Sequence, residues 1–151
     1  MKILITLFLF VSLSISYSSL AIEPKKMLVV VNDNQKSELL GVRDVTNYMN
    51  RIGSEFHIYS LQDVEGFEAF FSEGLPSDET LARVAVQKKY DEMGEEKLTA
   101  MALKAYQAKI LTMKYRLQKY PAIIIDDEYV IYGERDLNRA LNYYLELEEP
   151  K

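Results

Sequence analysis

The sequence predicts an α/β domain built on a mixed β-sheet, and three patterns support this fold class. A continuous apolar run at residues 27–31, a helical pattern and an alternating strand at residues 55–61 together make a β-α-β unit. Two further apolar runs lie close together between residues 121 and 133, as in a β-hairpin. A helical pattern over residues 134–147 follows them. The crossover makes the first two strands parallel, whereas the hairpin makes the last two antiparallel, so the sheet is mixed.

The composition is that of a folded, acidic protein. Of 151 residues 48% are hydrophobic, and 11 tyrosines and 6 phenylalanines supply bulky groups for a core, which argues against disorder. The formal net charge of −5 gives no support to nucleic-acid binding, which depends on clustered basic charge. The chain has no cysteine, so stabilising disulfides, thiol–disulfide exchange and thiolate metal ligands are excluded.

Residues 1–21 are predicted to be an export signal that is not part of the fold. Lys2 supplies the positive amino-terminal region, and residues 3–11 are almost entirely apolar. Ser19 and Ala21 are the small residues that a signal peptidase requires three residues and one residue before its cleavage site. The alternative is a retained membrane anchor, but the apolar run is shorter than the about 20 residues that span a bilayer. Cleavage leaves residues 22–151 as one exported domain without stable membrane insertion.

The first strand and helix of the β-α-β unit have separate signals. Residues 27–31 are apolar and β-branched without alternation, which predicts a strand buried on both faces and central in its sheet. Apolar residues at helical spacing over residues 45–52 predict a helix that ends at Gly53, where a left-handed C-cap is favoured. The start of this helix is left open as far back as Ser37, because Gly41 interrupts the pattern.

The second strand alternates. Phe56 and Ile58 are predicted to face one side of the sheet, and His57 and Tyr59 the other. A short helix is expected to follow, capped by Asp63 and burying three apolar side chains, namely Val64, Phe67 and Phe71.

A helical insertion is predicted at about residues 77–118. Ser77 is a good N-cap, Leu81 and Val84 lie on one face, and Gly94 permits a break. Beyond it a second stripe keeps helical spacing: Leu98, Met101, Ala102, Ala105, Tyr106, Ile110, Met113 and Leu117. The segment is either one kinked helix or a helical hairpin. The stripe is interpreted as core packing, with a groove for a partner helix as the alternative.

The sequence offers little catalytic chemistry. His57 is the one histidine, there is no G-x-S-x-G elbow and no phosphate-binding glycine loop, so neither a zinc site of the usual type nor a hydrolytic triad is supported. Asp126, Asp127 and Glu128 are the densest carboxylate cluster. They are interpreted as a tight turn, since Asp tolerates the backbone angles that such turns require, with a hard cation site as the alternative. No metal or other cofactor is predicted.

Pro121 gives the best candidate site. A proline that opens a strand is trans by default, but the order β-α-β, helices, then Pro-β-β-α is that of the thioredoxin fold, in which this proline is cis. There the residue before the cis-proline has backbone groups free to pair with an extended peptide. We therefore predict a partner contact by β-augmentation at Tyr120 and Pro121, assisted by the loop of Asn32, Asp33 and Asn34.

The string KYPAIIIDDEYVIYGERDLNRAL at residues 119–141 resembles the C-terminal signature of a thioredoxin-like family of exported proteins encoded on integrating conjugative elements. Two short sequences, EGLP at residues 73–76 and AYQ at residues 105–107, also resemble that family. One difference is Asp127, at a position where the family tends to have glycine. The resemblance implies a periplasmic role in conjugative transfer, in assembly of the mating channel or pilus of a type IV secretion system. Its implied partners are other envelope proteins of that apparatus.

Because residues 32–35, where a redox enzyme of this fold carries Cys-x-x-Cys, contain no cysteine, we expect binding and no catalysis. Two alternatives stay open. One is an enzyme, either a chaperone or isomerase relative without redox cysteines or a metal-dependent hydrolase that uses the acidic turn. The other is a structural subunit that docks on another chain through the stripe from Leu98 to Leu117.

Overall fold

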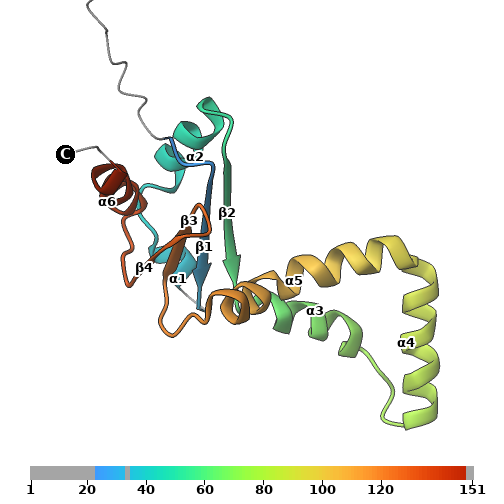
Figure 1. Cartoon of the computed structure of the whole chain (residues 1–151). Coiled ribbons are helices and arrows are strands. Elements are labelled where there is room, and N and C mark those ends of the chain that lie inside the picture. The colour runs from blue at the N-terminus through green and yellow to red at the C-terminus, as the bar shows by residue number, and fades with distance from the viewer. Residues whose placement is uncertain (1–22, 33–34, 149–151) are drawn as a thin grey trace, which may run out of the picture.

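A four-stranded mixed sheet organises the structure (Figure 1). The computed structural model describes residues 23–32 and 35–148. Strand β1 runs parallel to β2 and antiparallel to β3, and β3 runs antiparallel to β4, which gives the order β2-β1-β3-β4. The strands are β1 (Lys26–Val31), β2 (Glu55–Ser60), β3 (Ala122–Ile125) and β4 (Tyr129–Tyr132). The predicted α/β class and mixed sheet are confirmed.

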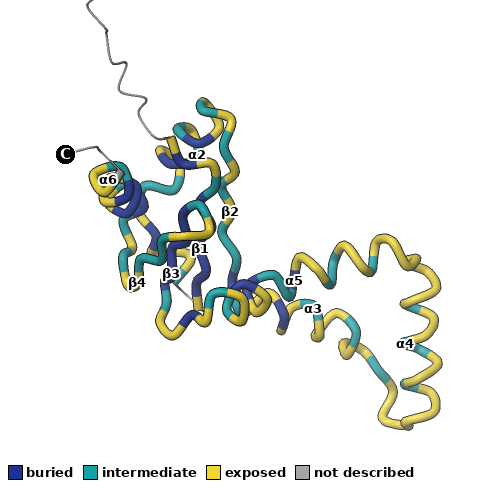
Figure 2. The backbone as a smooth tube through the Cα atoms, viewed as in Figure 1, coloured by how far each residue is buried: buried dark blue, intermediate teal, exposed yellow. Residues whose placement is uncertain are grey.

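The described helices cover the two faces of the sheet unequally. They are α1 (Gln35–Glu38), α2 (Val42–Arg51), α3 (Asp63–Ser72), α4 (Glu79–Met93), α5 (Glu95–Tyr115) and α6 (Leu137–Glu148). Helices α2 and α6 pack on one face, and the carboxyl-terminal half of α5 packs on the other. Helix α4 stands away from the sheet, and Figure 2 shows that it is exposed or partly exposed and has no buried residue.

Strand β1 is the centre of the sheet, as predicted. Its side chains from Met27 to Val31 are between 0% and 6% exposed, because strands flank it on both edges and helices cover both faces. Alternation sends Met27, Val29 and Val31 toward α2 and α6. Leu28 and Val30 face α5.

The final helix also follows its predicted pattern. Leu137 and Ala140 are fully buried, Tyr144 is 3% exposed, and all three pack into the core cluster that α2 shares.

Gly41 explains why the start of the second helix could not be located from the sequence. The chain forms the short helix α1, passes through Gly41 at φ 74°, and begins α2 at Val42. A Cβ atom on Gly41 would lie 2.5 Å from the side-chain Nδ2 of Asn138 on α6. Leu40, next to it, exchanges backbone hydrogen bonds with Arg135 and Leu137. Glycine is therefore required both for the left-handed backbone and for close approach to α6.

Two predicted helix caps are displaced by one residue. Helix α4 is capped by Asp78, whose side chain accepts a hydrogen bond from the Leu81 N–H at 3.0 Å, and not by Ser77. In α3 the N-cap is Gln62, and Asp63 instead accepts from the Ser60 N–H at 3.3 Å. Ser77 and Asp78 are both good caps and are difficult to separate by sequence alone, whereas Gln62 makes no side-chain capping hydrogen bond.

Core packing is the wrong interpretation for part of the helical insertion. Leu81 and Val84 on α4 are 58% and 63% exposed. In α5 the buried face is Ala105, Ala108 and Leu111, whereas Met113 of the predicted stripe is 71% exposed. The predicted stripe is correct at Ala105 and Leu117, which are buried, and wrong at Ile110 and Met113, because Ala108 and Leu111 face the sheet in that part of α5.

Helices α4 and α5 are separate, divided at Gly94, which has φ 80°. Within the described residues, no helix combines the length and apolar character needed to cross a membrane. The predicted export signal at residues 1–21 lies outside the described residues.

Candidate partner-binding site

Of the predicted site residues, Asn32, Tyr120 and Pro121 are described, and they lie at the carboxyl end of β1, where one side chain joins Asn32 to Tyr120. The Gln35 side chain accepts a hydrogen bond from the Asn32 N–H through Oε1 at 3.0 Å. Its Nε2 donates to the carbonyl oxygen of Tyr120 at 3.2 Å. The Tyr120–Pro121 peptide bond is cis. Asn32 and Tyr120 are thus bridged by a residue that the sequence had not singled out.

Hydrogen bonds to α5 and to the end of the β3–β4 hairpin fix the positions of Tyr120 and Pro121. The Tyr120 hydroxyl lies 2.9 Å from the Thr112 hydroxyl on α5. The carbonyl of Pro121 accepts from the Gly133 N–H at 2.8 Å, which closes the open end of the β3–β4 hairpin. Pro121 is buried and Tyr120 is half-buried. The loop therefore presents a fixed backbone rather than a large exposed side chain.

The bridge limits what Tyr120 can offer to a partner. The predicted β-augmentation needs both the N–H and the C=O of this residue, yet Gln35 already occupies the carbonyl. No described residue accepts a hydrogen bond from the Tyr120 N–H. A partner strand can use that donor directly, but it must share or displace Gln35 to use the carbonyl. Asn32 is exposed beside it, whereas Asp33 and Asn34 lie outside the described residues.

The acidic turn has a structural function. Asp126 and Asp127 both have positive φ, 53° and 63°, as the turn interpretation predicts. One oxygen of Asp126 accepts from the backbone N–H groups of Lys25 and Lys26, each at 2.8 Å. The other accepts from the buried hydroxyl of Tyr144 on α6 at 2.8 Å. This carboxylate therefore joins the hairpin, the start of β1 and the last helix.

Asp127 lies in a cluster of opposite charge. Its Oδ2 lies 2.7 Å from the ammonium nitrogen of Lys26, and its Oδ1 lies 3.6 Å from that of Lys114. The Tyr115 hydroxyl donates a hydrogen bond to the same Oδ1. The hydrogen bond from Lys26, then that from Tyr115, lowers the pKa of the Asp127 carboxyl from 3.8 to about 2. Across residues 23–32 and 35–148, no three histidine or acidic side chains are placed to hold a metal ion.

We expect the stabilising effect of Asp127 to disappear in acid. Because its pKa is lowered on folding, the contribution is complete above the ordinary value of 3.8 and is lost as the pH falls toward about 2. The unfolding free energies of the wild type and of Asp127→Asn should therefore differ at pH 6 and converge near pH 2. Urea titrations across this range measure the difference, and high salt should reduce it because the pair is exposed. A difference that grew in acid would contradict the assignment.

Comparison with known proteins adds a family. Residues 38–148 match the family described as "Protein of unknown function (DUF1525)". The match spans well over half of the chain and includes Tyr120, Pro121 and the acidic turn. No curated protein and no solved structure matches the chain. The chain therefore belongs to the DUF1525 family.

Proposed function

We propose that this chain is a non-catalytic, thioredoxin-like binding or assembly factor that acts in the periplasm as part of a conjugative transfer system. Its partners in this proposal are other envelope proteins of the mating-pair apparatus. The partner contacts the backbone of Tyr120 and the exposed end of β1 at Asn32, where it forms hydrogen bonds in the manner of an added strand.

The observation that carries the proposal is the junction formed by Gln35. Hydrogen bonds at 3.0 and 3.2 Å fix the end of β1 and the loop before β3 in one arrangement, with the Tyr120 N–H left without a described acceptor. The strand order β2-β1-β3-β4, with a parallel first pair and an antiparallel hairpin, supports the thioredoxin-like arrangement. With no cysteine in the chain, disulfide exchange has no thiolate to use, so this junction favours recognition.

The proposal is tested by affinity capture from the periplasm of donor cells on the immobilised chain. Asn32→Lys places a long cationic side chain at the site, and Pro121→Ala alters the loop itself. We expect the wild type to retain one or more envelope transfer proteins and both variants to retain at least about tenfold less, as for the loss of a central contact. Quantitative mass spectrometry of the eluates provides the measurement.

Asn50→Lys is the matched control. It makes the same change at an exposed position near the end of α2, at the opposite end of the sheet from Asn32. This variant should capture as the wild type does, and circular dichroism should show that all variants are folded. Equal capture by Asn32→Lys and Asn50→Lys would reject the site. An eluate without envelope transfer proteins would reject the proposed role.

A further inference from the structure

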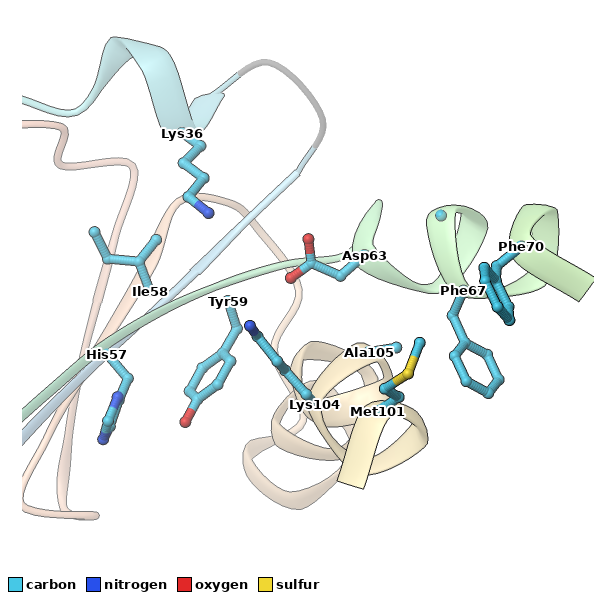
Figure 3. Close-up of a pocket in the computed structure, with 11 residues that line it drawn as sticks. Lys36, His57, Ile58, Tyr59, Asp63, Phe67, Phe70, Met101, Lys104 and Ala105 are labelled. Carbon is cyan, nitrogen blue, oxygen red and sulfur yellow. The ribbon is translucent and has the colours of Figure 1, made fainter. Parts of the chain in front are cut away.

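A groove runs beside β2, at the edge of the sheet opposite β4. It has a volume of about 600 Å³, within the range of ligand sites, and is bounded by β2, α3 and α5 (Figure 3). Its apolar part is formed by Phe67, Phe70 and Met101, and Phe70 is 42% exposed. Large apolar side chains gathered in an open groove favour a site for a further apolar group.

The backbone of β2 is available along this groove. Strand β2 is at the edge of the sheet, with β1 as its one neighbour among the described strands. The N–H group of Glu55 donates to the carbonyl oxygen of Lys25, just before β1, and that of Leu61 donates to the carbonyl oxygen of Val31, the last residue of β1. Odd-numbered residues of this segment therefore direct their backbone N–H and C=O groups toward β1. The N–H and C=O groups of Phe56 and Ile58 consequently point outward, because these groups alternate along a strand. The edge can therefore pair with an added strand.

The polar rim of the groove is cationic although the whole chain is acidic. Lys36 from α1 and Lys104 from α5 both line the groove, and Figure 3 shows their ammonium groups near the β2 strand. Neither lysine has an ion-pair partner in the described part of the chain. His57 also lines the groove. The opposing charge is Asp63, whose carboxylate already accepts from the Ser60 N–H at 3.3 Å.

We propose that this groove binds an extended segment of another protein in which acidic and apolar side chains alternate. The segment pairs as a strand with the outward backbone groups of Phe56 and Ile58. Because alternate side chains of a strand point to opposite faces, its carboxylates lie on the α5 face against Lys104, and its apolar side chains lie on the other face beside Phe56 and Ile58. Charge complementarity selects an acidic segment, and the free edge selects an extended one. The site is separate from the Tyr120 junction and does not depend on the function proposed for it.

The probe is a fluorescein-labelled peptide in which Glu alternates with Val, Leu and Phe, and fluorescence anisotropy measures its binding to the wild-type chain. Lys104→Glu should weaken binding about fivefold or more, since it replaces an attractive contact with a repulsive one. Lys97→Glu is the matched control, because Lys97 is an exposed lysine of the same helix that does not line the groove. It should bind within about twofold of the wild type. A peptide with Lys in place of Glu should not bind.

Strand pairing is tested on the peptide, so that no variant has to fold. The backbone is N-methylated either at every Glu or at every apolar residue, which blocks one hydrogen-bonding edge or the other. One methylated peptide should lose binding and the other should keep it.

Equal binding of the two methylated peptides, binding of the cationic peptide, or equal losses in Lys104→Glu and Lys97→Glu would each overturn the proposal. So would a dimer of the chain, seen by analytical ultracentrifugation, that Lys104→Glu dissociates, since a second copy would then occupy the groove. Asn32→Lys should leave peptide binding unchanged, which separates this site from the Tyr120 junction.

Discussion

Ile124→Ala is expected to lower the free energy of unfolding by about 4 kcal/mol. Ile124 lies in β3, is fully buried, and packs with Leu28, Val30 and Leu111 between the sheet and α5. Truncation removes the transfer free energy of the lost methylenes and leaves a cavity, since strands fix the backbone on both sides of β3. Urea denaturation followed by far-ultraviolet circular dichroism measures the loss.

Two further variants make this result interpretable. Ile110→Ala makes the same change on α5 where the side chain is 38% exposed, and it should cost less than about 1 kcal/mol. If Ile124→Ala is already unfolded in buffer, Ile124→Val should still fold and lose about 1 kcal/mol. Similar losses at positions 124 and 110 would mean that α5 does not pack on the sheet as described.

Asp126→Ala is expected to cost about 3 kcal/mol, nearly as much as the core truncation. The substitution removes a charged acceptor from two backbone N–H groups and leaves the buried Tyr144 hydroxyl without its partner. It also places alanine at φ 53°, and this backbone strain accounts for about 1 kcal/mol of the expected 3 kcal/mol. Thermal and urea unfolding of the variant provide the measurement.

Two more substitutions separate these causes. Asp126→Asn tolerates the left-handed backbone but lacks the charge and one acceptor oxygen, so its loss should be intermediate. Tyr144→Phe removes the hydroxyl alone and should cost about 1 kcal/mol. Glu128→Ala, at an exposed position of the same turn, is the control and should be nearly neutral. If Asp126→Asn were as damaging as alanine, backbone strain would be a negligible part of the effect.

The parts of the fold that were predictable are those with a repeating local pattern. The uninterrupted run at residues 27–31 required a central strand, and the spacing from Leu137 to Tyr144 required a helix with one buried face. Turn chemistry similarly placed positive φ at Asp126 and Asp127. Each of these features is determined by residues that are close together in sequence.

The unpredicted parts depend on contacts between distant residues. Gln35 and Tyr120 are 85 positions apart, and nothing local to either residue indicates their hydrogen bond. The one available signal was that Gln35 stands three residues after Asn32, a spacing suited to a turn. The exposure of Leu81 and Val84 was hidden for a similar reason, since an apolar stripe does not specify whether a neighbour covers it.

The central strand has a consequence for the order in which the chain can fold. Strand β1 obtains one neighbour from the β-α-β half and the other from the hairpin that follows the long helices. The Asp126 carboxylate, 101 and 100 positions from Lys25 and Lys26, likewise joins β1 after the hairpin has been synthesised. Until then one edge of β1 has no partner strand, because the long loop between β1 and β3 must close before the contacts between them can form. The amino-terminal half therefore completes its sheet only when the last third of the chain has been synthesised.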